Sequence, residues 1–330
     1  MTIPEVHAHG DGRSMGRTYG EAFADGIQES LAFYNGILGG AKVSADLGRY
    51  IDAARAAAPL LAEEVEGIAE GAGISSEDAW WLNCLEEVSN TEACTTMVFG
   101  PWLMHAEQWY AGHSAVGIVI AHPDSGPDFI SPTCVGFLPA VGLSSAGFAQ
   151  GIDSLYASDD RIGIPRVVVS RRALGSRSVE DAVAAACMPG RAGGYAHTLA
   201  STSGIVVVET TASTEIVMRN TAAHTNHYLS DPPWGTPPPS QGSESRLHRA
   251  FELLEQTPPQ NLEDCAALLS DHNGTPQSIC LHGDVPAASA TVFGMVCDIG
   301  TGQVIVSDGP PCRGRWEEFS LPLSEASLVE

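Results

Sequence analysis

Cys94 is the residue of this sequence with the clearest potential for chemistry. It follows Glu92 and Ala93 and precedes Thr95 and Thr96, where a helix-rich N-terminal quarter gives way to a sheet-rich remainder. If the chain cut itself between Ala93 and Cys94, the freed α-amino group could act as base for the adjacent thiol. The two groups titrate near ~8 and ~8.5, so this proton transfer is feasible near neutral pH. The alternative is a cysteine buried at a strand start, because free cysteine packs as a small hydrophobe.

The stretch His224-Thr225-Asn226-His227 contains a second group of interest. The side-chain amide of Asn226 can donate a hydrogen bond to an oxyanion, and losing one such donor typically slows catalysis about 100- to 1,000-fold. The alternative is that Asn226 caps a turn, as asparagine readily does. His224 and His227 could bind a metal, but no third ligand follows at suitable spacing, so we expect no metal site here.

Apolar periodicity and breaker residues predict the elements that must position these groups. Helices are expected over 10–38, 47–57, 60–70, 79–85, 165–174, 179–187, 246–256 and 262–270. Strands are expected over 96–103, 116–121, 129–135, 148–152, 196–200, 205–209 and 215–219, with a hairpin of 291–297 and 303–307. The proline-rich segment 231–240 cannot be regular, because proline lacks the amide donor, and is expected to be an exposed loop. This order of elements predicts a layered α+β fold and not a doubly wound parallel sheet.

Composition and charge exclude several classes of partner. The chain has 330 residues, 16 basic and 40 acidic side chains, and a net charge of −24. That charge disfavours nucleic acid and anionic membrane surfaces. No apolar stretch approaches the roughly 18 to 20 residues of a membrane span, and the N-terminus shows no secretory signal, so a cytoplasmic location is expected.

The cysteines give no sign of a disulfide framework. They are scattered without CxxC pairs, which in a chain of this length favours reduced thiols and counts against a structural zinc site. Their positions are 84, 94, 134, 187, 265, 280, 297 and 312.

Several short segments form a series along the chain: Cys94-Thr95-Thr96, Ser144 to Ala149, Ile162 to Pro165 with Arg171-Arg172, His224 to His227, Ser245-Arg246, Ser278-Ile279-Cys280 and Gly309-Pro310-Pro311. In this order they resemble the motifs of the acyl-coenzyme A:6-aminopenicillanic acid acyltransferase family of N-terminal-nucleophile (Ntn) hydrolases, which is cysteine peptidase family C45. The resemblance extends from about Gly10 to Cys312.

This resemblance implies a four-layer αββα Ntn fold with two stacked antiparallel sheets. It also implies self-cleavage between Ala93 and Cys94, which would release residues 1–93 as an α chain and leave 94–330 as the catalytic β chain of one αββα domain. Cys94 would then attack an amide or thioester carbonyl, and Asn226 would support the oxyanion. The α/β heterodimer would come from one precursor, and a higher oligomer remains open.

The sequence departs from the family pattern beside the expected site. Where the penicillin-pathway enzymes have Asn-Trp-Asp, this chain has Gln108, Trp109 and Tyr110, so a neutral tyrosine replaces the supporting aspartate. Glu107 is a candidate replacement carboxylate, although alternation along a strand would point it away from the side of Tyr110. Thr211 retains a hydroxyl at a supporting position of the family.

Other polar and aromatic residues are weaker candidates for the site. Asp153 lies close to the turn at 144–147 and is a candidate substrate contact, together with Glu107, Gln108 and Trp109. For Trp109 the core is favoured over a ligand platform, because aromatic side chains dominate cores. His105 is expected to be a structural histidine.

These observations predict a self-processing cysteine amidohydrolase. Its expected substrate is a small N-acyl compound or a short peptide conjugate, for example from secondary metabolism. No glycine-rich phosphate loop marks a coenzyme A site, and no cofactor is expected. One alternative is an acyltransferase that uses an acyl thioester donor and an amine acceptor. The other is an unprocessed, non-catalytic relative that binds a ligand and keeps Cys94 as core.

Overall fold

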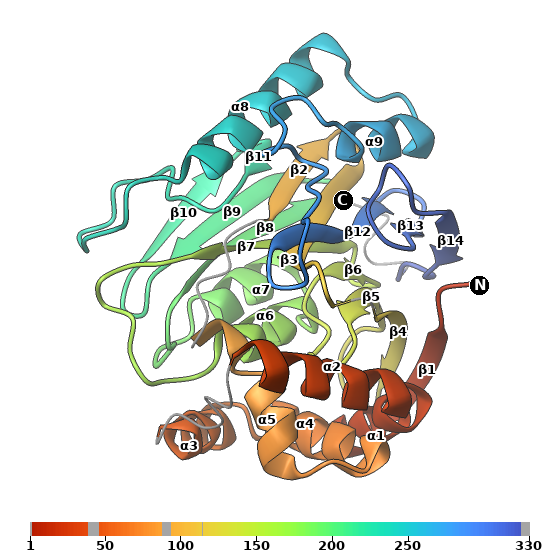
Figure 1. Cartoon of the computed structure of the whole chain (residues 1–330), viewed down its shortest axis with the longest axis vertical. Coiled ribbons are helices and arrows are strands. Elements are labelled where there is room, and N and C mark those ends of the chain that lie inside the picture. Colours follow the sequence, from red (N-terminus) through yellow and green to blue (C-terminus); the bar gives the residue numbers. More distant parts are fainter. Residues whose placement is uncertain (1, 39–45, 88–93, 114, 325–330) are drawn as a thin grey trace.

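Two β-sheets stack face to face at the centre of the molecule (Figure 1). The computed structural model describes residues 2–38, 46–87, 94–113 and 115–324, and the fold is given for these residues. The eight-stranded sheet has the order β1 (Glu5–Gly10), β4 (Val116–Pro123), β5 (Phe129–Cys134), β6 (Gly142–Ser144), β7 (Phe148–Leu155), β8 (Gly194–Ser201), β9 (Gly204–Thr210) and β10 (Glu215–Arg219). The six-stranded sheet has the order β11 (Ala223–His224), β2 (Thr95–Phe99), β3 (Trp102–Tyr110), β12 (Ser289–Asp298), β13 (Gln303–Ser307) and β14 (Trp316–Ser320).

Helices cover the outer face of each sheet and complete a four-layer αββα arrangement. On the eight-stranded sheet, α1 (Gly12–Ala22) packs on β1 and β4, while α6 (Arg166–Leu174) and α7 (Val179–Ala186) pack on β6 to β9. On the six-stranded sheet, α8 (Gln241–Gln256) and α9 (Leu262–Leu269) pack on β2, β3, β11 and β12. The remaining N-terminal elements are α2 (Ala24–Ile37), α3 (Leu47–Ala57), α4 (Pro59–Ala72), α5 (Ser76–Leu82) and the 3₁₀ turn η1 (Leu85–Glu87). None of the described helices is both long and apolar enough to cross a membrane.

The structure confirms the α+β class, the layering and the C-terminal hairpin. The hairpin is formed by β12 and β13, with Met295 paired to Val306. The segment 231–240 contains no helix or strand, as its prolines predicted. One pairing at the edge of the larger sheet differs from the rest, because β1 pairs in parallel with β4, from Glu5 opposite Ile118.

The helix expected over 10–38 is divided in two. Phe23 has φ −116° and ψ 21°, outside the helical region, and separates α1 from α2. Its ring lies directly over β4, where a Cβ atom at Gly117 would come within 2.7 Å of the ring. A side chain at position 117 would therefore meet the ring of Phe23, and the ring would have to shift.

The described part of the N-terminal segment shares a core with the rest of the chain. Besides the pairing of β1 with β4, the buried carboxylate of Glu64 forms an ion pair of 3.0 Å with the buried guanidinium of Arg171. Asn83 donates a hydrogen bond to the carbonyl of Gly136 at 3.1 Å and accepts one from the backbone N–H of Leu138 at 2.7 Å. Residues 2–38 and 46–87 are therefore built into the fold and are not an appendage.

Candidate active site

Cys94 lies directly before β2, buried between the two sheets, with 6% of its surface exposed. Its backbone N–H donates a hydrogen bond of 2.8 Å to Oδ1 of Asn226. Its Sγ atom lies 3.8 Å from Oε1 of Glu107 and 3.9 Å from the carbonyl oxygen of Gln108. The structure thus brings together the thiol, the amide and one carboxylate that the sequence singled out. The expected cleavage partner Ala93 lies outside the described residues.

Asn226 is held by groups from both sheets and from α8. It follows β11, and its Nδ2 donates to the carbonyl of Ser154 in β7 at 3.3 Å. Its backbone N–H donates to Oγ of Ser243 at 2.9 Å. Because Oδ1 accepts from Cys94, the amide plane has a fixed orientation beside the thiol, and one N–H of Nδ2 remains for a further acceptor.

Arg246 is a site residue to which the sequence analysis assigned no role. This buried side chain of α8 donates to the carbonyl oxygen of Cys94, to Oγ1 of Thr95 at 2.8 Å and to Oδ1 of Asn226 at 2.9 Å. A signal was present, because Ala250 and Leu253 lie four and seven positions later and are buried on the same helical face. An arginine on such a face needs buried acceptors, which here are the backbone carbonyl of Cys94 and oxygen atoms of Thr95 and Asn226.

Glu107 is oriented by His105, which the sequence analysis treated as structural. Both residues lie on the same face of β3, as alternation requires, and Nε2 of His105 is hydrogen-bonded to Oε2 of Glu107 at 3.0 Å. The other ring nitrogen is bonded to Oγ1 of Thr96 at 2.9 Å. The sheets come very close here, since a Cβ atom at Gly151 would lie 2.7 Å from the methyl group of Thr96.

The same face of β3 offers donor atoms that a metal could use. Ligand atoms of Cys94, His105 and Glu107 all lie within 4.8 Å of one another. Both nitrogens of His105 are already hydrogen-bonded, however, so neither offers a free lone pair without rearrangement. We therefore interpret the three residues as a thiol beside an oriented carboxylate, and not as a metal site.

Buried acids dominate the electrostatics around the thiol. Burial, followed by the negative charges of Glu107 and Asp153, raises the pKa of the Cys94 thiol well above its ordinary value. Burial also raises the pKa of Asp153 to about 6, against the opposing effect of His224, whose Nδ1 lies 3.8 Å from Oδ2. Burial raises the pKa of Glu86 to about 7, although Tyr195 donates a hydrogen bond to it. The thiol in this environment is protonated at neutral pH and needs a base.

Asp153 should make the stability of the fold depend on pH. Folded Asp153 keeps its proton up to about pH 6, whereas the unfolded side chain loses it near its ordinary value of 3.8. The folded state therefore binds more protons, and the free energy of unfolding falls as pH rises from about 4 to about 6, by up to about 3 kcal/mol from this group. Urea unfolding of uncut Cys94→Ala protein at several pH values measures this slope. Adding Asp153→Asn should flatten it, and equal slopes in the two proteins would show that Asp153 ionises normally.

A cavity with mostly apolar walls opens beside Glu107. Its lining includes Glu86, Trp109, Phe137, Leu138 and Tyr195. The ring of Trp109 forms part of this wall, while its Nε1–H donates to the hydroxyl of Tyr34. Trp109 is thus both a core residue and a wall of the cavity. A group bound here would lie next to the carboxylate that faces the thiol.

Three expected site residues have side chains with partners other than the thiol. Gln108 directs its side chain to the carbonyl of Ile279, to which Nε2 donates at 2.5 Å. Tyr110 packs against aromatic rings, with centroid distances of 5.9 Å to Tyr34 and 5.4 Å to Trp109. Thr211 lies in the turn between β9 and β10 and donates to Oδ2 of Asp159 at 2.8 Å. Direct roles for these residues remain predictions that the geometry around Cys94 does not favour.

A buried thiol lies between the two sheets of this four-layer αββα fold, which is the geometry that the resemblance to Ntn hydrolases implied. Residues 120–308 match the family described as acyl-coenzyme A:6-aminopenicillanic acid acyl-transferase, over more than half of the 330 residues. The chain belongs to this family, and it is an enzyme of the acyl-transfer kind.

Solved structures show more distant likenesses. Penicillin V acylase from Agrobacterium tumefaciens is 15% identical, with a TM-score of 0.45 over 71% of this chain and 88% of that one. A variant of conjugated bile acid hydrolase from Clostridium perfringens is 11% identical, with a TM-score of 0.42 over 70% of this chain and 98% of that one. A comparison with curated protein sequences finds no match.

Proposed function

We propose that the protein cuts its own chain between Ala93 and Cys94 and then hydrolyses the amide bond of a small N-acyl compound or short peptide conjugate through an acyl-enzyme on Cys94. The observation that carries this proposal is the convergence of Asn226, Arg246 and Glu107 on the backbone and thiol of Cys94. These contacts hold in place both the nitrogen of the bond to be cut and the attacking sulfur.

Self-cleavage begins when Sγ of Cys94 attacks the carbonyl carbon of Ala93. The new C–S bond replaces the C–N bond, the nitrogen takes the thiol proton, and water then hydrolyses the thioester to a carboxylate and a free thiol. Arg246 donates to the carbonyl of Cys94 and so fixes the backbone on the far side of the scissile bond. Asn226 accepts from the nitrogen that becomes the α-amino group.

Turnover then uses the new α-amino group as base. It takes the proton of the Cys94 thiol, which the acid-rich surroundings otherwise keep in place. The sulfur attacks the substrate carbonyl, the free N–H of Asn226 donates to the oxyanion, and the leaving amine departs with a proton. Water releases the acid from the acyl-enzyme and regenerates the thiol.

The cavity and the charge favour a hydrolase acting on a small apolar acyl group. Phe137, Leu138 and Trp109 provide apolar walls next to Glu107. The carboxylates at the site and the net charge of −24 would repel the phosphates of a coenzyme A thioester. These features support an uncharged N-acyl substrate. The mature form that we propose is a cytoplasmic enzyme of two associated chains.

Capture of the acyl group tests this proposal. We expect aryl amides with acyl chains of increasing length to release the arylamine, and added hydroxylamine to yield the acyl hydroxamate in place of part of the acid. Amines intercept acyl-enzymes, so hydroxamate formation that disappears in Cys94→Ala locates the intermediate on the thiol. Arylamine release that persists in Cys94→Ala would refute the mechanism. Acyl transfer from a thioester to an amine, without amide hydrolysis, would instead establish the acyltransferase alternative.

A further inference from the structure

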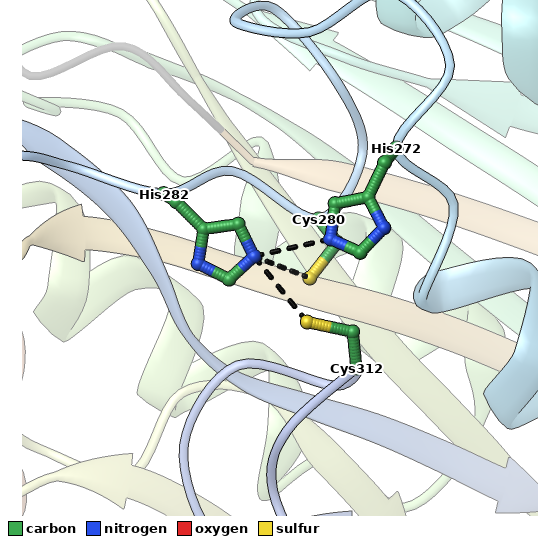
Figure 2. Close-up of side chains that lie close together, drawn as sticks. All are labelled: His272, Cys280, His282 and Cys312. Atoms are coloured by element: carbon green, nitrogen blue, oxygen red, sulfur yellow. Dashed lines mark hydrogen bonds between the residues drawn. The ribbon is translucent and has the colours of Figure 1, made fainter.

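Four potential metal ligands converge at the surface of the six-stranded sheet, outside the candidate active site. His272 lies in the loop after α9, Cys280 and His282 lie before β12, and Cys312 lies in the turn after β13. One ligand atom of each residue lies within 4.8 Å of every other. Figure 2 shows the four side chains pointing toward one another from these three segments.

The separations match those of a tetrahedral zinc site. Nε2 of His282 lies 3.1 Å from Nε2 of His272, 3.3 Å from Sγ of Cys312 and 3.8 Å from Sγ of Cys280. Zinc bonds of ~2.3 Å to sulfur and ~2.0 to 2.1 Å to nitrogen place tetrahedral ligand atoms roughly 3.3 to 3.8 Å apart. A small movement of His272 would therefore complete the coordination.

The ligand types also favour zinc. Thiolates exclude magnesium and calcium, which prefer oxygen, and a set of two cysteines and two histidines is typical of closed structural zinc sites. Both cysteines are free thiols in the structure. We propose that His272, Cys280, His282 and Cys312 bind one zinc ion in a four-coordinate structural site.

The sequence analysis expected no structural zinc because it found no CxxC pair. Cys280 and Cys312 are far apart in the sequence and meet only because the hairpin of β12 and β13 returns the chain to the loop before β12. Only the short spacing Cys280-Leu281-His282 was visible beforehand.

The zinc ion would stabilise an irregular loop that is hydrogen-bonded to β3, the strand beside Cys94. Within this loop, Ile279 accepts the hydrogen bond from Gln108 of β3, and Leu281 donates to Oγ1 of Thr291 at 2.8 Å. The carbonyl of Gln108 in turn lies 3.9 Å from Sγ of Cys94. Metal binding should therefore stabilise the loop and, through it, the geometry of β3.

A second histidine cluster provides a competing site within the chain. His7, His9 and His122 also have ligand atoms within 4.8 Å of one another. His7 and His9 are exposed, no thiol takes part, and Nδ1 of His122 is bonded to Asp128 at 2.8 Å. Substitutions in this cluster serve as the control for adventitious binding to histidine.

Metal analysis of untagged protein tests the proposal independently of catalysis. We expect about one zinc ion per purified chain, and at least a tenfold loss of zinc in Cys312→Ser and His282→Ala. Cys187→Ser, which removes a half-buried thiol elsewhere, and His7→Ala/His9→Ala should keep the metal. A metal content unaffected by Cys312→Ser but lost with His7→Ala/His9→Ala would overturn the assignment.

Cobalt replacement of zinc in wild-type protein gives a result that does not rely on the folding of variants. Cobalt(II) added to metal-free protein should produce the intense visible bands of tetrahedral coordination and a thiolate-to-cobalt charge-transfer band. Chelation should lower the Tm, and zinc should restore it, because the metal binds only the folded site. Weak octahedral bands, or a disulfide between Cys280 and Cys312 in freshly purified protein, would refute the proposal.

Discussion

The Cys94→Ala variant should remain one uncut chain and show no turnover, because the same sulfur forms the acyl bond in self-cleavage and in catalysis. Its fold should survive, since the polar contacts of Sγ with the described residues are long, at 3.8 Å to Glu107 and 3.9 Å to the carbonyl of Gln108. Intact mass under denaturing and reducing conditions measures the first effect. Wild-type protein should give two fragments that meet between Ala93 and Cys94.

Cys297→Ala is the matched control for this experiment. Cys297 is also a buried thiol of the six-stranded sheet, but it lies in the apolar core, on β12. Its substitution should cost some stability and leave both cleavage and turnover in place. An uncut wild-type chain that still hydrolyses amides would rule out the free α-amino group as the base. An uncut and inactive wild-type chain would favour the ligand-binding alternative.

Replacing Asn226 with alanine should lower kcat/KM by about 100- to 1,000-fold, the usual effect of losing one oxyanion donor. The variant also loses the acceptor for the backbone nitrogen of Cys94, so slower self-cleavage is expected as well. The cleaved fraction is measured by mass spectrometry, and rates are expressed per cleaved chain. This normalisation separates a defect in turnover from a defect in maturation.

Asn226→Asp distinguishes the two roles of the amide. It keeps oxygen acceptors for Cys94 and Arg246 but removes the Nδ2 donor. We expect cleavage to recover more than turnover, because turnover depends on the missing donor. Asn220→Gly is a suitable control, since Asn220 has φ 60°, which glycine adopts without strain. Full activity of Asn226→Asp would show that Asn226 only positions the nucleophile.

The sequence predicted the parts of the site that are encoded locally. Cys94 and Asn226 were found because their motifs are short, and the structure places them in contact. Alternation in β3 predicted that Glu107 and Tyr110 point to opposite sides, but not which side faces the thiol. That choice depends on how the second sheet packs. Arg246 was missed as a site residue for the same reason, because its acceptors come from another layer of the fold.

The fold shows the same division between local and distant information. The helices expected near 79–85 and 179–187 are present. Each begins after a capping serine, Ser75 or Ser178, whose side chain accepts from the backbone three positions later, at 3.0 and 3.1 Å. The strand β1 was missed, because its parallel partner β4 lies more than a hundred residues away. The zinc ligands proposed above were hidden likewise, since only the folded hairpin brings Cys312 to His282.

Because the N-terminal segment shares a core with the rest of the chain, the unfolding of a cleaved protein should depend on protein concentration. The ion pair of Glu64 with Arg171 and the hydrogen bonds of Asn83 join the described part of this segment, 2–38 and 46–87, to the rest of the fold without a covalent link. Cleavage would thus be invisible to size measurements on native protein. Unfolding of the cleaved protein, however, would separate two polypeptide chains. The midpoint of the unfolding transition would therefore rise with protein concentration. Refolding of the mature enzyme would then be a bimolecular reaction, because the two separated chains would have to associate again at their low cellular concentration.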